Sequence, residues 1–227
     1  MTVDAVIFDW GGTLTPWHTI DVADLWGSVC ARHFPATDAI AFAAALHAAE
    51  SQLWRLSAQV YRSATMDALF ELAGVAATAD LLASYVQAWE PHTYTDPDVP
   101  DLFRYLRSRG IRVGVLSNTM WPRRWHDDVF RRDGVLDLID GAVYTSEINW
   151  TKPHPEAFRA VMTAIGASDP ARCVFVGDRP FDDVHGAQQA GLRAVLVPNS
   201  DVPTYSAAVP DAVISRLAEL PPLLAAW

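Results

Sequence analysis

The sequence predicts an α/β protein with a doubly wound, parallel-sheet (Rossmann-like) core and an inserted all-helical domain. From residue 101 onward, short apolar runs alternate with amphipathic helical segments, the pattern of right-handed β-α-β units. Between about residues 21 and 94, apolar residues recur at three- and four-residue spacing, which is typical of helices. We therefore expect a core domain of residues 1–15 and 96–227, with residues 16–95 as a helical lid.

The composition narrows the class of protein. Hydrophobic residues make up 51% of the chain and charged residues 19%, which favours a well-buried globular core. The net charge of −10 argues against nucleic-acid binding, because that function needs a basic face. The most apolar stretch, residues 39–49, is far shorter than the roughly 20 residues of a membrane span, so we expect a buried helix and no membrane partner. Cys30 and Cys173 lie in unlike segments and are interpreted as reduced thiols, which predicts a cytoplasmic protein.

The first strand organises the rest of the core. An apolar run at residues 5–8 leads directly to Asp9 and then to the pair Gly11-Gly12. Such a run before a glycine turn indicates a buried parallel strand, which places Asp9 at its carboxyl end. Open α/β sheets bind their ligands at that edge. A plain strand-to-turn transition has the same local pattern, so the functional interpretation depends on the other strand ends.

The remaining elements of the core follow in alternation. Four further strands are expected at residues 111–116, 142–145, 172–176 and 193–197. The helices between them are expected at residues 101–109, 122–132, 155–165 and 183–190. The lid, which we expect to hold four or five helices, interrupts the chain just after the first strand, so it would lie above the carboxyl ends of the strands.

Two further strand ends carry groups that suit a phosphate. Ser117 and Asn118 follow the second strand and offer a hydroxyl and backbone N–H groups near a helix start, although an ordinary helix cap has the same residues. Lys152 is the only lysine among 17 basic residues and stands just before a helix, where a cation opposes the helix dipole. A nearby anion would compensate it. A solvated surface lysine is the alternative.

A fourth strand end carries three carboxylates within six positions: Asp178, Asp182 and Asp183. Clustered carboxylates repel one another unless a cation lies between them. Hard oxygen ligands suit Mg²⁺, which accepts a site with few protein ligands. Capping of the next helix explains Asp182 or Asp183 in part, but it does not explain Asp178.

These four strand ends, in this order, resemble the motifs of the haloacid dehalogenase (HAD) superfamily of hydrolases, and the helical insert lies where that family's C1 caps lie. The resemblance covers residues 1–15 and about 96–200. It implies a Mg²⁺-dependent phosphatase that acts on a small phosphorylated metabolite through an aspartyl phosphate. It also implies a role for each motif. Asp9 would be the nucleophile, Ser117 and Asn118 would bind the phosphate, and Lys152 would neutralise its charge. The metal would be held by Asp9, the Gly11 carbonyl, Asp178 and Asp183, with Asp182 as a bystander.

One position departs from the family pattern. The second aspartate of these phosphatases, two residues after the nucleophile, acts as general acid, and here that position is Gly11. A general acid contributes roughly 10²–10⁴ in rate, so we expect poor hydrolysis of alkyl phosphates unless another group, with His18 or Asp21 nearest in sequence, replaces it. The alternative hypothesis is a catalytically weak protein that binds a phosphorylated ligand or a protein partner.

Two other branches of the superfamily also lack this aspartate. Phosphonoacetaldehyde hydrolases need a lysine in the cap, and residues 16–95 contain none. Dehalogenases need no metal, whereas the segment from Gly177 to Asp183 is acidic, so a dehalogenase is disfavoured.

Three side chains are candidate substrate contacts: His18, Trp121 and Arg123. Trp121 and Arg123 follow the second motif, and an aromatic ring beside a guanidinium suits an aromatic or anionic part of a substrate. For Trp121 the alternative is packing in the seam between the domains. For His18 it is a polar residue of a linker.

Overall fold

The computed structural model describes residues 3–227, and its core is a six-stranded parallel sheet with the strand order β3-β2-β1-β4-β5-β6. The chain moves outward from β1 in both directions, so β1 lies between β2 and β4 at the point where the strand order reverses. The strand bounds are β1 Ala5–Phe8, β2 Arg112–Ser117, β3 Gly141–Tyr144, β4 Cys173–Gly177, β5 Arg193–Leu196 and β6 Ala212–Val213. This arrangement confirms the predicted α/β class, and it places the carboxyl end of β1 at the point where open α/β sheets bind ligands.

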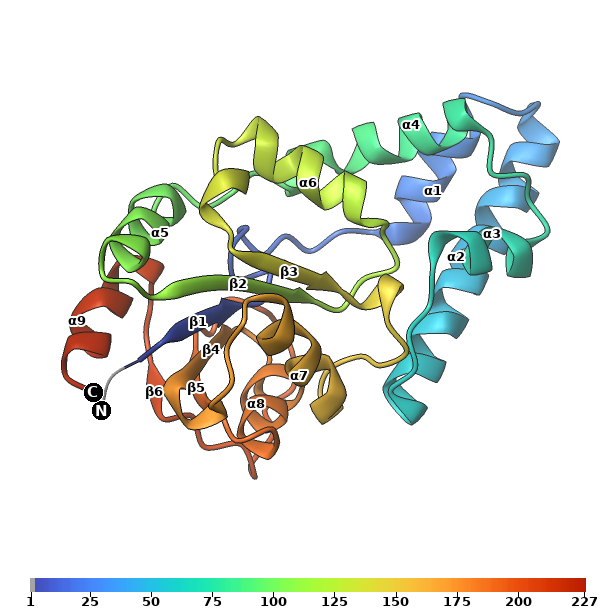
Figure 1. The fold of residues 1–227 in the computed structure, drawn as a ribbon. Helices are drawn as coiled ribbons and strands as arrows, with labels where there is room; N and C mark the ends of the chain where they lie inside the picture. The colour runs from blue at the N-terminus through green and yellow to red at the C-terminus, as the bar shows by residue number, and fades with distance from the viewer. Residues whose placement is uncertain (1–2) are drawn as a thin grey trace.

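Helices cover both faces of the sheet (Figure 1). Alternate residues of β1 explain the two layers, because Val6 and Phe8 pack into one apolar cluster and Ala5 and Ile7 into another. The first cluster is closed by α5 (Val99–Ser108), α6 (Arg123–Arg132) and α9 (Leu220–Ala225), and the second by α7 (Pro155–Ala164) and α8 (Gly186–Gln189). All four residues of β1 are fully buried, as expected for a central parallel strand.

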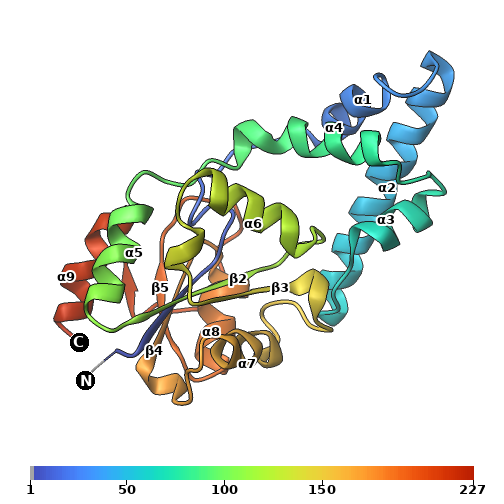
Figure 2. The same ribbon diagram turned by 45° about the horizontal axis from the view of Figure 1, so that its top comes forward.

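Residues between β1 and α5 form a helical insert, as predicted. Its helices are α1 Val22–Cys30, α2 Ala36–Val60, α3 Met66–Ala73 and α4 Ala79–Trp89, followed by the short 3₁₀ helix η1 Glu90–His92. The arrowheads of β2 and β3 point toward this insert (Figure 1), and the turned view shows it extending away from the sheet (Figure 2). The side chains of Asp21, Thr65 and Thr78 cap α1, α3 and α4, which fixes where these helices begin.

The insert and the core are joined at more places than the two connecting segments. Thr151 N–H donates to the Tyr61 carbonyl at 3.0 Å, and Ser63 N–H donates to the Asn149 carbonyl at 3.3 Å. These bonds form a short antiparallel bridge between the end of α2 and the loop that carries Lys152. We call this contact the side bridge.

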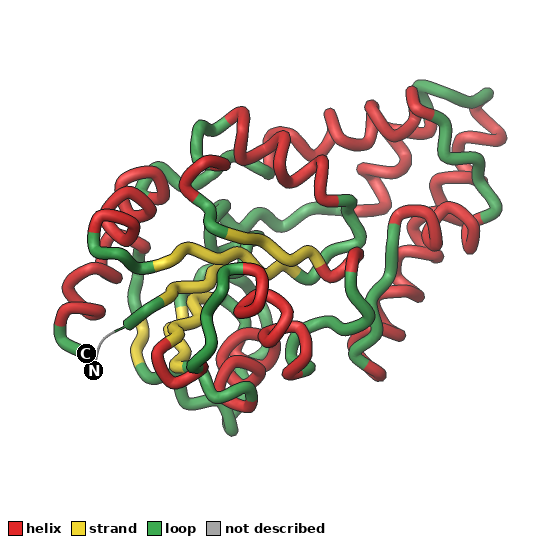
Figure 3. Tube along the Cα trace, in the orientation of Figure 1, coloured by secondary structure: helices red, strands yellow, loops and turns green. Residues whose placement is uncertain are grey.

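The structure also differs from the sequence prediction in several elements. The helix expected at residues 183–190 begins as a π-helix over Pro180–His185 and continues as α8, because Asp183 turns back to accept a hydrogen bond from the Arg179 N–H at 2.9 Å. The strand β6 and helix α9 were not predicted, since two and six residues are too few to show a period. The secondary structure along the chain is mapped in Figure 3. Within residues 3–227, every helix is too short or too polar to cross a lipid bilayer.

Candidate active site

The strand ends that the sequence singled out meet at one edge of the sheet. Asp9 directly follows β1, Ser117 ends β2, and Asp178 directly follows β4. Lys152 reaches the same place from the loop before α7. The parallel order of the strands produces this convergence, because all carboxyl ends lie on one edge.

Three buried carboxylates form the centre of the site. Asp9, Asp178 and Asp183 each place an oxygen within 4.8 Å of the others, and their exposed fractions are 5%, 1% and 0%. Among the described residues, Asp178 Oδ2 is buried and has no hydrogen-bond partner. Burial, together with the charges of Asp9 and Asp183, raises the pKa of Asp178 to about 8. A hard divalent cation fits this oxygen set, because it would offset the repulsion and bind the orphaned oxygen.

Two glycines allow the carboxylates to approach the backbone this closely. Gly12 has a φ of +89°, and a Cβ there would lie 2.5 Å from Asp178 Oδ2. A Cβ on Gly177 would lie 2.3 Å from Asp183 Oδ2. The cradle around the carboxylates therefore requires glycine at both positions.

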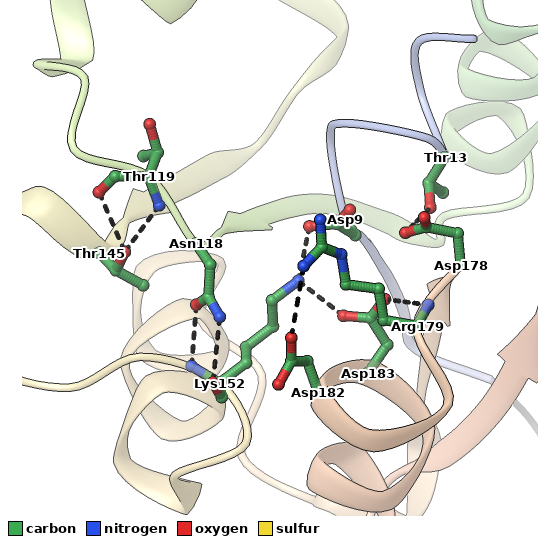
Figure 4. A network of polar contacts seen from close by, with 10 residues as sticks. All are labelled: Asp9, Thr13, Asn118, Thr119, Thr145, Lys152, Asp178, Arg179, Asp182 and Asp183. Carbon is green, nitrogen blue, oxygen red and sulfur yellow. Dashed lines mark hydrogen bonds and ion pairs between the residues drawn. The ribbon is translucent and has the colours of Figure 1, made fainter. Parts of the chain in front are cut away.

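Lys152 links the nucleophile candidate to the acidic cluster (Figure 4). Its Nζ lies 2.5 Å from Asp9 Oδ1 and 2.7 Å from Asp183 Oδ1. Burial would lower the pKa of Lys152, but Asp183 and Asp9 outweigh burial and raise it above the usual range. The lysine therefore stays charged beside the carboxylates of Asp9 and Asp183.

Asn118 has a role that the sequence did not reveal. Its side-chain amide donates to the Lys152 carbonyl at 3.0 Å, and its Oδ1 accepts from the Lys152 N–H at 2.9 Å (Figure 4). This pair of bonds fixes the backbone of the loop from which Lys152 projects. Because both polar groups of the Asn118 side chain are hydrogen-bonded to Lys152, the backbone N–H of Asn118 is the group that could still donate to a phosphate. The only sign of this pair of hydrogen bonds in the sequence was the side-chain amide of Asn118 beside Ser117.

Position 11 is open. Gly11 is not among the glycines with positive φ, and no atom of the described chain lies within 4 Å of a Cβ built there. The missing general acid is therefore not explained by a backbone or packing constraint at this glycine.

The three expected substrate contacts engage other parts of the protein. Trp121 is 7% exposed, packs with the residues of the insert, and donates from Nε1 to the Tyr85 hydroxyl at 3.2 Å. Arg123 pairs with Glu147 at 2.5 Å and donates to a backbone carbonyl. The partners of both side chains lie in the seam or beside β3, and the roles of Trp121 and Arg123 as substrate contacts stay predictions.

His18 also has a partner of its own. Its Nδ1 lies 2.8 Å from Nδ1 of His92, so the two segments that connect the insert to the core touch at this point. His18 therefore lies where these two segments meet, and its roles as a substrate contact or as the replacement acid stay predictions.

The sequence analysis missed Arg179. This residue directly follows Asp178, and Figure 4 shows its side chain extending across the acidic cluster with a dashed line to Asp182. Its closest carboxylate is that of Asp182, at 3.8 Å. A basic residue adjacent to a predicted metal ligand was the available signal.

The comparisons with known proteins agree with this geometry. Residues 3–191 match the family model of the haloacid dehalogenase-like hydrolases. A glyceraldehyde 3-phosphate phosphatase from Methanothermobacter thermautotrophicus is 34% identical over 97 residues, which are 43% of this chain and 41% of the relative. The chain spans about half the length of the curated relatives it matches.

Solved structures share the fold. A HAD phosphatase from Thermococcus onnurineus superposes with a TM-score of 0.69 at 22% identity, covering 98% of both chains. A 2-haloacid dehalogenase from Pseudomonas syringae gives the same TM-score at 24% identity and covers both chains completely. Because a phosphatase and a dehalogenase match equally well, the fold alone does not select between these reactions.

Proposed function

Since the chain belongs to the haloacid dehalogenase-like hydrolases, we propose that it is a Mg²⁺-dependent phosphatase of small phosphorylated metabolites. The observation that carries this proposal is the buried group of Asp9, Asp178, Asp183 and Lys152 at the carboxyl edge of the sheet. Relatives named as phosphatases of glyceraldehyde 3-phosphate and of phosphoserine support the same class of substrate. We propose residues 16–95 as the cap that covers the site. The cytoplasmic location stays a prediction.

The proposed reaction is a phosphoryl transfer to Asp9. A carboxylate oxygen of Asp9 attacks phosphorus, the bond from phosphorus to the leaving oxygen breaks, and water then hydrolyses the aspartyl phosphate. Lys152, whose Nζ lies 2.5 Å from Asp9 Oδ1, positions this carboxylate and offsets charge on the phosphoryl group. Asp9, Asp178, Asp183 and the Gly11 carbonyl would hold Mg²⁺. When bound, the ion supplies compensation of negative charge between nucleophile and phosphate.

The acidic cluster favours this reaction over dehalogenation. A dehalogenase of this family needs no metal, whereas here Asp178 Oδ2 is buried without a partner in the described chain. An extra buried carboxylate of this kind is costly unless a cation binds it. The cluster is therefore better suited to a reaction that uses a divalent ion.

A phosphatase panel with Mg²⁺ tests the proposal. It should include acyl, aryl, sugar and nucleotide phosphates, and 2-chloropropionate as the dehalogenase control. We expect turnover of phosphates and none of the haloacid, with Asp9→Asn losing more than about 10⁴-fold in kcat, by analogy with removal of other catalytic nucleophiles. The matched control is Asp101→Asn, which changes an exposed surface carboxylate. Retained activity in Asp9→Asn would exclude the covalent mechanism.

A second candidate function is supported by Gly11. Without a general acid, the same site would bind a phosphorylated ligand or partner and release it unchanged. Under that hypothesis, the panel gives binding without turnover for every leaving group. A substrate that turns over with a kcat near the typical value of about 10 s⁻¹ would exclude it.

A further inference from the structure

The charges at the site are unevenly compensated. Asp9, Asp178 and Asp183 carry three negative charges, and Lys152 lies within 2.7 Å of two of them. A divalent ion and this lysine together would balance the three carboxylates. The dianionic phosphoryl group of a substrate would then arrive at a neutral centre, so a further cation is needed to bind it strongly.

Arg179 is placed to be that cation. In Figure 4 its side chain extends from the loop after Asp178 across the acidic cluster, and a dashed line joins the guanidinium to Asp182. Asp9, Asp178 and Asp183 each place an oxygen within 4.8 Å of the others beside this loop. The guanidinium therefore lies at the acidic cluster.

The side chain of Arg179 is held loosely while its backbone is fixed. Its N–H donates to Asp183 Oδ2 at 2.9 Å, which anchors the main chain beside the cluster. Its guanidinium approaches Asp182 only to 3.8 Å, longer than a hydrogen bond, and 42% of the side chain is exposed. The guanidinium also lies over the face of Trp17, with its central carbon 5.8 Å from the ring centroid.

This combination is unusual for a structural arginine. A structural guanidinium uses its fork of five donors on close acceptors, as Arg132 does with Asp133 and the Thr93 carbonyl. Among residues 3–227, the Arg179 guanidinium instead has Asp182 as its only carboxylate within 4 Å, at 3.8 Å, so its donors have no close acceptor. The fork matches two oxygens of one phosphoryl group.

We infer that Arg179 binds two oxygens of the phosphoryl group that Asp9 accepts, leaving Asp182 when the substrate enters. Arg179 is thus a substrate-binding residue, additional to Lys152 and Ser117. The inference depends on the proposed function in one respect, because that function identifies the ligand as a phosphoryl group. Asp182 is the partner that holds the guanidinium at the site between substrates.

Binding of inorganic phosphate tests this without turnover. Isothermal titration of the Mg²⁺-loaded protein would compare the unmodified chain with Arg179→Met, Arg179→Lys and Asp182→Asn. We expect Arg179→Met to weaken phosphate binding by about tenfold or more, because hydrogen bonds to a charged group are lost. Arg179→Lys should recover only part of this loss, since an ammonium lacks the fork. Asp182→Asn should bind phosphate at least as tightly as the unmodified protein.

A matched control separates this effect from a general change of charge. Arg104→Met removes another exposed arginine that pairs with an aspartate three residues away, and we expect unchanged phosphate affinity. Circular dichroism and thermal unfolding show whether each variant is folded. A variant of Arg179 that is folded and binds phosphate like the unmodified protein would refute the inference.

The remaining outcomes are also decisive. If Arg179→Met leaves phosphate affinity intact but raises KM only for substrates with a second anion, such as phosphoserine, then Arg179 recognises the leaving group. The assignment of Arg179 to the phosphoryl group is wrong in that case. If phosphate binding depends on Arg179 but the protein turns over no phosphate, the inference holds and the proposed phosphatase activity is rejected. Absence of phosphate binding in the unmodified protein would reject both.

Discussion

The carboxylate cluster and the aromatic seam are both buried, but their interactions are of opposite kinds. In the cluster, like charges lie together and Asp178 keeps an unpartnered oxygen within the described chain. In the seam, Met120, Trp121 and Trp125 of the core pack with residues of the insert, including Tyr85 and Trp26. The seam lowers the free energy of the folded state, whereas the cluster raises it until a ligand binds. Function should therefore depend on the cluster and stability on the seam.

The largest expected effect concerns the reaction at the carboxylate cluster. Gly11→Asp should raise kcat on alkyl phosphates by part of the roughly 10²–10⁴ available to a general acid, and nitrophenyl and acyl phosphates should gain little. The structure adds that the change is sterically allowed, since nothing described lies within 4 Å of the new Cβ. The measurement is a plot of rate against the pKa of the leaving group for both proteins.

The neighbouring glycine is the control for Gly11→Asp. Gly12→Asp would place a Cβ 2.5 Å from Asp178 Oδ2 at a φ of +89°, so activity and thermal stability should both fall. A flat dependence on leaving group in the unmodified protein, with phosphorylation rate-limiting, would show that another acid already serves the site.

The next effect tests the seam. Trp121→Ala should lower the free energy of unfolding by about 3–5 kcal/mol, because truncation of a buried tryptophan leaves a cavity. Urea denaturation measures this loss. Trp54→Ala is the control, since Trp54 is 39% exposed on the insert. An unchanged free energy of unfolding in Trp121→Ala would show that the seam does not stabilise the fold.

The third effect concerns pH and Mg²⁺ at the cluster. The pKa of Asp178 is raised from 3.8 to about 8 in the metal-free protein, so the folded state binds the extra proton between these values. The contribution of this group to stability therefore falls as pH rises from about 4 to 8. Mg²⁺ competes with the proton, and its apparent affinity should rise by up to about tenfold per pH unit in this window.

Thermal unfolding with and without Mg²⁺ measures this dependence. The increase in Tm on adding Mg²⁺ should be larger at pH 8 than at pH 5.5, and Asp178→Asn should reduce it at both. A shift that is equal at the two pH values would contradict the raised pKa of Asp178.

The smallest effect belongs to the side bridge. Arg62 lies 4.0 Å over the Trp150 ring, and Trp150 stacks on His154 near Lys152. Arg62→Ala should cost about 0.5–1 kcal/mol of unfolding free energy, the value of an exposed cation–π contact. Arg55→Ala, which changes an exposed arginine on the preceding helix α2, is the control. A loss as large as that of Trp121→Ala would mean that the side bridge, and not the seam, holds the insert in place.

The sequence by itself determined the fold class and the meeting of the motifs. Apolar runs of four to six residues, each followed by a polar group, specify buried parallel strands, and their order brings Asp9, Ser117 and Asp178 to one edge. These signals are local, because the period of a strand or a helix is set by neighbours along the chain. For this reason the helical insert was also predictable.

Only the tertiary structure decided the partners of individual side chains. His18 pairs with a residue 74 positions away, and Asn118 with one 34 positions away. Only the structure showed that Trp121 packs in the seam. It also showed that the Arg179 side chain, whose position after Asp178 was its one signal in the sequence, lies 3.8 Å from Asp182. Such pairings depend on how distant elements approach in space, and a local period carries no information about that approach.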